Sequence, residues 1–153
     1  KANIASYLQN YKILNDFVMI DDGRIINLGI NFVVQVDKAY NKRDVIVNCI
    51  NVLKNYFLVD KWQMSDTIYI SQVSELLRDQ PGVTNVVSIE FKNKVGGDYS
   101  SDVLADNFNL SDVVRITQSG ETNITPVNNK IKAPLTGMFE IKYPNKDIKG
   151  AAI

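Results

Sequence analysis

The feature that most constrains the fold is an alternation of apolar and mostly polar residues over residues 24–37. Successive side chains of a β-strand point to opposite faces of the sheet, so a period of two gives one apolar face and one polar face. The pattern predicts a long strand of an antiparallel sheet with one face buried and the other wet. Burial at about 1.5–3 kcal/mol per side chain supplies a gross driving force on the order of 10 kcal/mol, before chain entropy is subtracted. The apolar positions are Ile26, Leu28, Ile30, Phe32, Val34 and Val36.

Composition sets limits on the class of protein. A chain of 153 residues with 45% hydrophobic residues is large enough to bury one core. Its 17 basic and 17 acidic side chains give zero net charge, so we expect neither nucleic acid nor a membrane as partner. The chain has no histidine, which excludes a Ser-His-Asp triad and nearly every zinc site. We therefore expect no enzyme activity, no small-molecule substrate, no cofactor and no metal.

The single cysteine, Cys49, excludes an internal disulfide. It falls in the apolar stripe of a predicted helix that begins after Asn41, a good N-cap, with Asp44 near the positive helix end. The pattern favours a small buried side chain over a nucleophile, because the chain has no histidine to activate the thiol. The stripe should lie on the apolar face of the long strand and consists of Ile46, Cys49, Ile50, Leu53 and Phe57.

The segments before and after these two elements are shorter. Residues 4–14 have the spacing of a short amphipathic helix, and residues 17–20 predict a short strand. A hairpin turn at residues 21–24, which contain an Asp-Gly pair, would join this strand to the long one. We expect residues 62–64 to form a further extended piece.

A second helix and a second long strand complete the predicted core. Ser71 can cap this helix, which packs through Val73, Leu76 and Leu77 and stops at the Gln-Pro-Gly of residues 80–82. The strand over residues 83–91 has three apolar side chains on one side, Val87, Ile89 and Phe91. This order predicts an α+β fold: a small antiparallel sheet with two helices packed on one face, an open-faced, ferredoxin-like sandwich.

The rest of the chain divides it into three predicted segments. Residues 1–92 form the α+β core domain. Residues 93–137 are broken repeatedly by glycine, serine and proline, which predicts a long irregular excursion or arm. Residues 138–153 form a C-terminal strand and tail that return to the core, and Pro144 ends the strand.

Several short patterns resemble chemical sites but favour simpler interpretations. The Asp21-Asp22 pair has no third ligand nearby in the sequence, so a turn is favoured over a metal site. The Gly96-Gly97 pair lacks the lysine and the helix signature of a phosphate loop, which favours a flexible turn. Asp98, Asp102 and Asp106 do not have the spacing of a calcium loop, so solvated carboxylates are favoured.

A series of short patterns over residues 7–91 begins with Leu8, the Asn15-Asp16-Phe17 run, and residues 23–27 with the alternating strand. It continues with Asn41-Lys42, Ile70-Ser71, Leu76-Leu77 and Pro81-Gly82-Val83, and the tail reads FEIKYPNKDIKG at residues 139–150. On these features, residues 7–91 and the tail resemble the C-terminal part of the baseplate wedge proteins of T4-like contractile-tailed phages, the baseplate J-like family.

The resemblance implies a structural role. Proteins of this family form part of the inner baseplate ring around the tail hub, associate with each other and with other wedge subunits, and lack catalytic residues. The resemblance therefore implies a virion protein of the tail baseplate that is assembled in the host cytoplasm, with itself and other wedge proteins as partners. Because family members are much longer, the chain resembles their C-terminal piece.

Large aromatic residues in polar surroundings are the candidates for an assembly interface, because such residues are enriched at the energetic centres of interfaces. For Trp62 an interface and a core position stay open, and for Tyr56 a core position is favoured. The candidates are Trp62, Tyr99, Phe108, Tyr143 and Tyr56.

Two other functions stay open on the sequence. A ferredoxin-like domain could be a regulatory module that binds a small molecule between its sheet and its helices. An enzyme that uses the carboxylates of Asp98, Asp102 and Glu121 has little support, because the sequence does not bring any two of them together.

Overall fold

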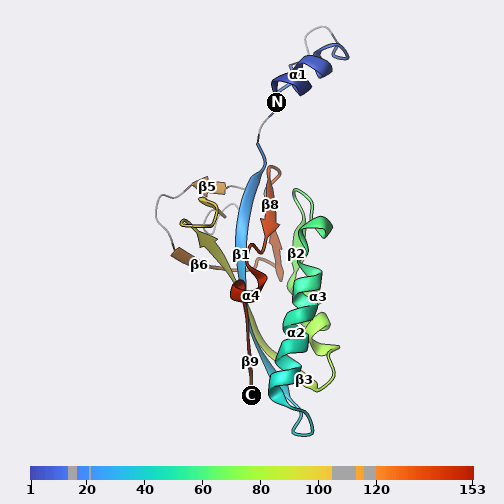
Figure 1. The fold of residues 1–153 in the computed structure, drawn as a ribbon, viewed down its shortest axis with the longest axis vertical. Coiled ribbons are helices and arrows are strands. Elements are labelled where there is room, and N and C mark those ends of the chain that lie inside the picture. Colours follow the sequence, from blue (N-terminus) through green and yellow to red (C-terminus); the bar gives the residue numbers. More distant parts are fainter. Residues whose placement is uncertain (14–16, 21, 105–112, 116–119) are drawn as a thin grey trace.

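The long alternating stretch is strand β1 (Arg24–Val36), and it forms the centre of a five-stranded mixed sheet (Figure 1). The computed structural model describes residues 1–13, 17–20, 22–104, 113–115 and 120–153. β3 (Val83–Val95) pairs with β1 in antiparallel direction. The other strands of this sheet are β6 (Gly120–Ile124), β8 (Gly137–Glu140) and β9 (Ile148–Ala152).

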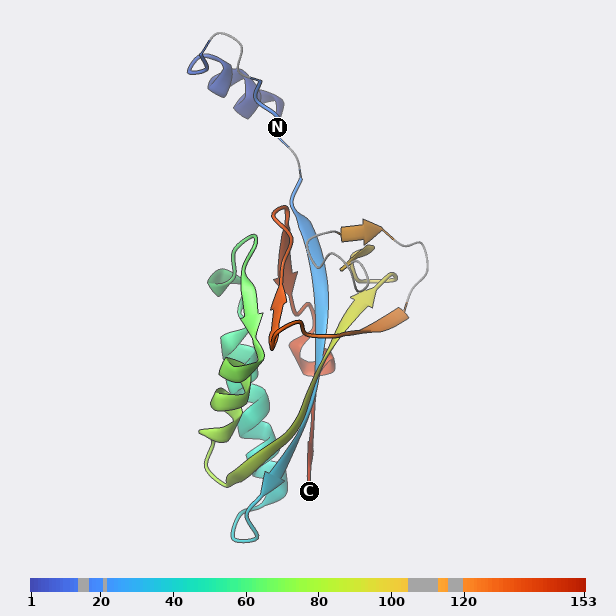
Figure 2. The same cartoon turned by 180° about the vertical axis from the view of Figure 1, so that it is seen from behind.

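Helices α2 (Lys42–Tyr56) and α3 (Ile70–Arg78) cover the apolar face of β1, as the sequence predicts (Figure 2). All the predicted apolar positions of β1 are buried, from Ile26 to Val36. Cys49 is fully buried in the same core, and this burial raises the pKa of its thiol to about 11. The predicted core position of Cys49 is therefore confirmed.

The smaller elements frame this core. The helices are α1 (Ala2–Gln9), the 3₁₀ turn η1 (Val59–Lys61) and α4 (Pro144–Asp147). Two separate strand pairs are β2 (Thr67–Tyr69) with β7 (Lys130–Lys132), and β4 (Asp102–Leu104) with β5 (Val113–Arg115). Within the described part of the chain, no helix is long and apolar enough to cross a membrane.

Helix ends agree with the sequence at one predicted cap and differ at another. The Asn41 side chain accepts a hydrogen bond from the Arg43 N–H at 3.0 Å, so the predicted N-cap is confirmed. The prediction that Ser71 caps α3 is wrong, because β2 runs directly into a helix that begins at Ile70. The Ile70 N–H instead donates to the Asn129 carbonyl at 3.0 Å.

The predicted strand at residues 17–20 is wrong. These residues lie outside the strands, and the Phe17 side chain is 96% exposed. β8 runs parallel to Arg24–Asn27 along one edge of β1, and β3 pairs with the other edge from Asn27 onward. These two strands take most of the edge positions that a hairpin partner would need.

The predicted helix of residues 4–14 is shorter in the structure. α1 ends at Gln9, and residues 14–16 lie outside the described residues. No residue of α1 is buried, so tertiary packing does not support a longer helix. The extended piece expected at residues 62–64 is also displaced, since the strand begins at Thr67.

The sheet is mixed, which corrects the prediction of an antiparallel one. β8 and β9 follow one another along the same edge of β1, and both run parallel to it. Pro144 does not simply end the last strand, because the strand stops at Glu140 and Pro144 lies in the first turn of α4. The strand β9 that follows contains glycine and alanine and has no strong strand pattern.

The bulge in β3 changes which of its side chains face the core. Val33 pairs with Ser88 and Val34 pairs with Val86, so Val87 is an extra residue in the ladder. Val87 is consequently 51% exposed, although the sequence places it on the same side as Ile89 and Phe91.

The second face of β1 is covered at its first half, which corrects the prediction of a wet face. Asn27 and Gly29 are buried there beneath residues 99–100 and the end of α4. The sheet takes strands from all three predicted segments, and β3 runs across the boundary at residues 92 and 93.

We predict that Val34→Asp costs several kcal/mol of unfolding free energy, because it places an unpaired charge among buried apolar side chains. Gln35→Asp is the matched control, since Gln35 is the next residue and is exposed. Urea melts of both variants test this. Equal midpoints would contradict the assignment of these residues to the two faces.

Candidate functional site

Two of the predicted interface aromatics, Tyr56 and Trp62, pack together at the end of α2. The Trp62 ring stacks on Phe57 with centroids 5.3 Å apart, and it meets the Tyr56 ring edge-on at 5.5 Å. The Trp62 Nε1–H donates to the Tyr56 carbonyl at 3.0 Å, and Phe57 in turn contacts Phe91 of β3. Both residues therefore join α2 to the sheet while keeping half-buried outer edges.

The other two described aromatics, Tyr99 and Tyr143, meet near the C-terminal tail. Their rings pack edge-on with centroids 5.6 Å apart. The Tyr99 hydroxyl donates to Asp147 Oδ1 at 2.7 Å, and the Tyr143 backbone N–H donates to Asp147 Oδ2 at 3.0 Å. The fifth candidate, Phe108, lies outside the described residues.

Asp147 is the centre of a buried charged cluster that the sequence did not predict. Its carboxylate is 3.3 Å from Lys94 Nζ, and the side chains of both residues are almost wholly buried. Lys94 Nζ also lies 2.6 Å from Glu121 Oε1 on β6. Gly29 makes the approach possible, because a Cβ added there would lie 2.6 Å from Lys94 Cε. The cluster thus joins β1, β3, β6 and α4.

The electrostatics of this cluster keep Lys94, Glu121 and Tyr99 in their ordinary charge states. Burial lowers the pKa of Lys94, but the hydrogen bond to Glu121 and the charge of Asp147 outweigh it, so the pKa is raised. The hydrogen bond from Lys94 holds the pKa of Glu121 below its usual value. Burial, followed by the bond to Asp147, raises the pKa of Tyr99. None of these three pKa values moves toward neutral pH, which is typical of a structural cluster. We call Lys94, Tyr99, Glu121 and Asp147 together the clamp.

The predicted carboxylates are only partly brought together. Asp98 and Asp102 line a hollow of about 320 Å³ beside the clamp, together with Asn27 and Glu140. Asp106 lies outside the described residues, as does Asp21. Glu121 pairs with lysines on β3, away from that lining. Over the described ranges, no three acidic or cysteine side chains are placed to hold a metal ion.

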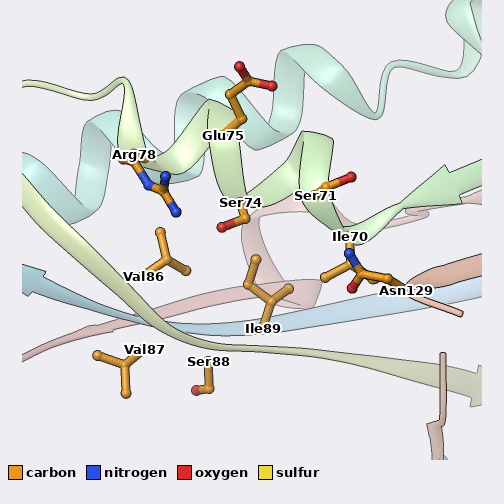
Figure 3. Close-up of a pocket in the computed structure, with 10 residues that line it drawn as sticks. All are labelled: Ile70, Ser71, Ser74, Glu75, Arg78, Val86, Val87, Ser88, Ile89 and Asn129. Atoms are coloured by element: carbon orange, nitrogen blue, oxygen red, sulfur yellow. The ribbon is translucent and has the colours of Figure 1, made fainter.

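A groove of about 500 Å³ between α3 and β3 was also missed by the sequence analysis (Figure 3). Ile70, Ser71, Ser74, Glu75 and Arg78 form its helix side. Four consecutive residues of β3 form the other side, Val86, Val87, Ser88 and Ile89, and Asn129 lines the groove beside Ile70. The sequence pattern gave no signal for it, because the groove depends on how far α3 stands from the strand.

The N-terminal arm, which we define as the described residues before Arg24 (1–13, 17–20, 22 and 23), includes the helix α1, which lies away from the sheet (Figure 1). The arm exposes a set of large apolar side chains, of which Phe17 and Met19 are 96% and 82% exposed. The other members are Ile4, Tyr7, Leu8, Tyr11, Ile13 and Val18. The spacing of the first four was visible in the sequence, but their exposure was not.

We predict that Tyr99→Phe costs about 1–2 kcal/mol of unfolding free energy, because it removes one of the hydrogen bonds to the buried Asp147 carboxylate. Tyr143→Phe is the matched control, since Tyr143 contributes its backbone N–H and its ring. Chemical denaturation of the two variants gives the comparison. A larger loss in Tyr143→Phe would refute the clamp.

The pKa shifts predict a loss of stability at alkaline pH. Raised folded-state pKa values of Lys94 and Tyr99 stabilise the protonated forms in the fold. Their contribution is complete below the unfolded values of about 10, and it is lost as the pH rises through the folded values. The stability difference between wild type and Tyr99→Phe should therefore stay constant up to about pH 10 and shrink between about pH 10 and pH 12. Urea midpoints across this range measure it, and a constant difference would contradict the assignment.

No protein-family model matches the chain, and no curated protein matches it.

Proposed function

We propose that the chain is a non-catalytic assembly module, a wedge component of the tail baseplate of a contractile-tailed phage. The observation that carries this proposal is the N-terminal arm, whose described large apolar side chains are exposed and whose helix α1 has no buried residue. Exposed apolar surface gathered on one segment is typical of a protein–protein contact, since burial in a complex removes it from water.

The internal chemistry of the body supports a structural role. Every buried side-chain nitrogen and oxygen of the described residues has a hydrogen-bond partner. The charged groups of the clamp are committed to one another, and the pKa of the Cys49 thiol is raised away from reactivity. Such groups hold the fold together and leave the surface for binding.

The phage assignment rests on the sequence resemblance over residues 7–91 and 139–150. The tail of this resemblance has a structural part in the fold. Residues 144–152 form α4 and β9, and they supply Asp147 to the clamp. The partners in this proposal are further copies of the chain and other wedge proteins, within the virion.

The alternative, a ferredoxin-like domain that binds a small molecule, has less support. That arrangement is built from split βαβ units, whereas here α2 and α3 connect two antiparallel neighbours, β1 and β3. The two helices on one face retain the open-faced layering without that connectivity.

We predict that antibodies against this chain label the tail baseplate of the phage particles that carry it. Negative-stain electron microscopy with gold-conjugated antibody measures the position of the label, and antibody against an unrelated cytoplasmic host protein is the control. Gold confined to the baseplate supports the proposal. Gold absent from purified tails, while the chain is abundant in the infected-cell lysate, would overturn it.

A further inference from the structure

We propose that the groove between α3 and β3 binds residues 17–20 of a second copy of this chain, added as a strand along the edge of β3. The inference deepens the proposed assembly role by naming the partner and the contact. Its experiment uses the purified protein alone, so it can fail while the labelling of phage tails succeeds, and the reverse.

The first half of β3 has a free edge. β1 pairs along nearly the whole of β3 on one side, but on the other side β6 pairs only with Phe91–Val95. Among the strands that the structure describes, none borders residues 83–90 on that side. A strand edge with unpaired backbone groups can accept a further strand from another chain.

The groove runs along this free edge. It is lined by four consecutive residues of β3, from Val86 to Ile89, whose side chains point to both faces of the strand. Figure 3 shows Val86 and Ile89 directed toward α3, and Val87 and Ser88 directed to the other side. Because the groove is lined by side chains from both faces of the strand, it lies along the edge of β3.

Apolar and polar groups in the groove suit a bound strand. Val86 and Ile89 of β3 and Ile70 of α3 supply the apolar side chains of the groove. Ser74 on α3 is a small polar side chain between them. Its volume of about 500 Å³ lies within the range of pockets that enclose ligands. A groove between a strand edge and a helix can offer backbone pairing on one side and side-chain pockets on the other.

Residues 17–20 have the properties that this groove requires. Their sequence is Phe-Val-Met-Ile, and they belong to no helix or strand of the chain. Phe17 and Met19 are two residues apart, so in an extended segment they point the same way. They are also the two most exposed apolar side chains of this segment, at 96% and 82%.

The arm of the same chain cannot reach this groove. The arm joins the sheet at Arg24, and Ile20 precedes it by four residues, which span at most about 14 Å. The groove begins at Ile89, which pairs with Phe32, eight residues along β1 from Arg24. At about 3.3 Å per residue, that is about 26 Å away. An arm that pairs with this edge of β3 therefore belongs to another copy of the chain.

An arm of one copy in the groove of the next is a contact between two different surfaces. Such a contact closes into a ring when the rotation allows it, or two copies exchange arms reciprocally. Both arrangements bury Phe17 and Met19, and both leave the folded body of each copy unchanged.

Two variants test the contact, one on each side of it. Phe17→Asp places a charge on the arm and has Asn10→Asp as its control, which adds the same charge at another exposed arm position. Ser74→Arg fills the groove and has Asn51→Arg on the exposed side of α2 as its control. Light scattering coupled to size-exclusion chromatography measures the mass of each full chain over a series of concentrations, and thermal melts check folding.

We expect wild type and both controls to form dimers or larger species, and Phe17→Asp and Ser74→Arg to weaken association at least tenfold without a change in Tm. An equimolar mixture of the two defective variants keeps one intact arm and one intact groove, so it should recover a dimer. If Ser74→Arg lowers Tm, Ser71→Arg, on the exposed turn of the same wall, replaces it.

Three results would overturn the inference: a monomeric wild type at every concentration, unchanged association in Phe17→Asp or in a folded groove variant, or a mixture that stays monomeric. Label on phage tails together with a monomeric pure protein would leave the baseplate role in place and remove the arm contact.

Discussion

The structure is organised around the burial of β1, along the whole of its apolar face and over the first half of its other face. One face is apolar along its whole length and needs α2 and α3 above it. The other face carries Asn27 at a buried position, and a buried amide must have hydrogen-bond partners. The Asn27 side chain donates to Glu140 at 2.8 Å and accepts from the Ser100 N–H at 2.7 Å. The excursion and the tail are thus both required to complete the central strand.

The charged clamp fixes where the tail lies. Buried ion pairs lose much of their attraction to desolvation, so their main effect here is to specify position, with less effect on stability. Asp147 is held by Lys94, Tyr99 and the Tyr143 N–H. The next residue, Ile148, begins β9 and pairs with Ile30. The clamp therefore sets the register of the last strand on β1.

The body and the N-terminal arm differ in how their groups are used. In the body, polar groups are paired and aromatic rings pack on one another, as in the cluster of Tyr56, Phe57 and Trp62. The described residues of the arm expose several large apolar side chains, and the groove beside β3 borders a part of that strand with no neighbouring strand among the described residues. These are the two surfaces that the proposed contact between copies would use.

The candidate site was only partly open to sequence reasoning. Trp62 and Tyr56 were named as interface candidates, with a core position left open for Trp62 and favoured for Tyr56, and the structure packs both against the edge of the core. Tyr99 and Tyr143 were named as well, but their common partner Asp147 was not, because nothing local connects residues 99 and 147. The groove was missed for the same reason: its walls come from α3 and β3, and its free edge depends on where β6 stops pairing.

Local and periodic patterns in the sequence were enough to predict several elements. The alternation in β1, the apolar stripe and Asn41 cap of α2, and the Pro-Gly stop after α3 are such patterns, and Gly82 does have a φ of +89°. The parallel pairing of β8 and β9, the burial of Asn27 and Lys94, and the exposure of the described arm residues became known only from the folded chain. Those features depend on contacts between segments far apart in the sequence, and a local pattern does not specify such contacts.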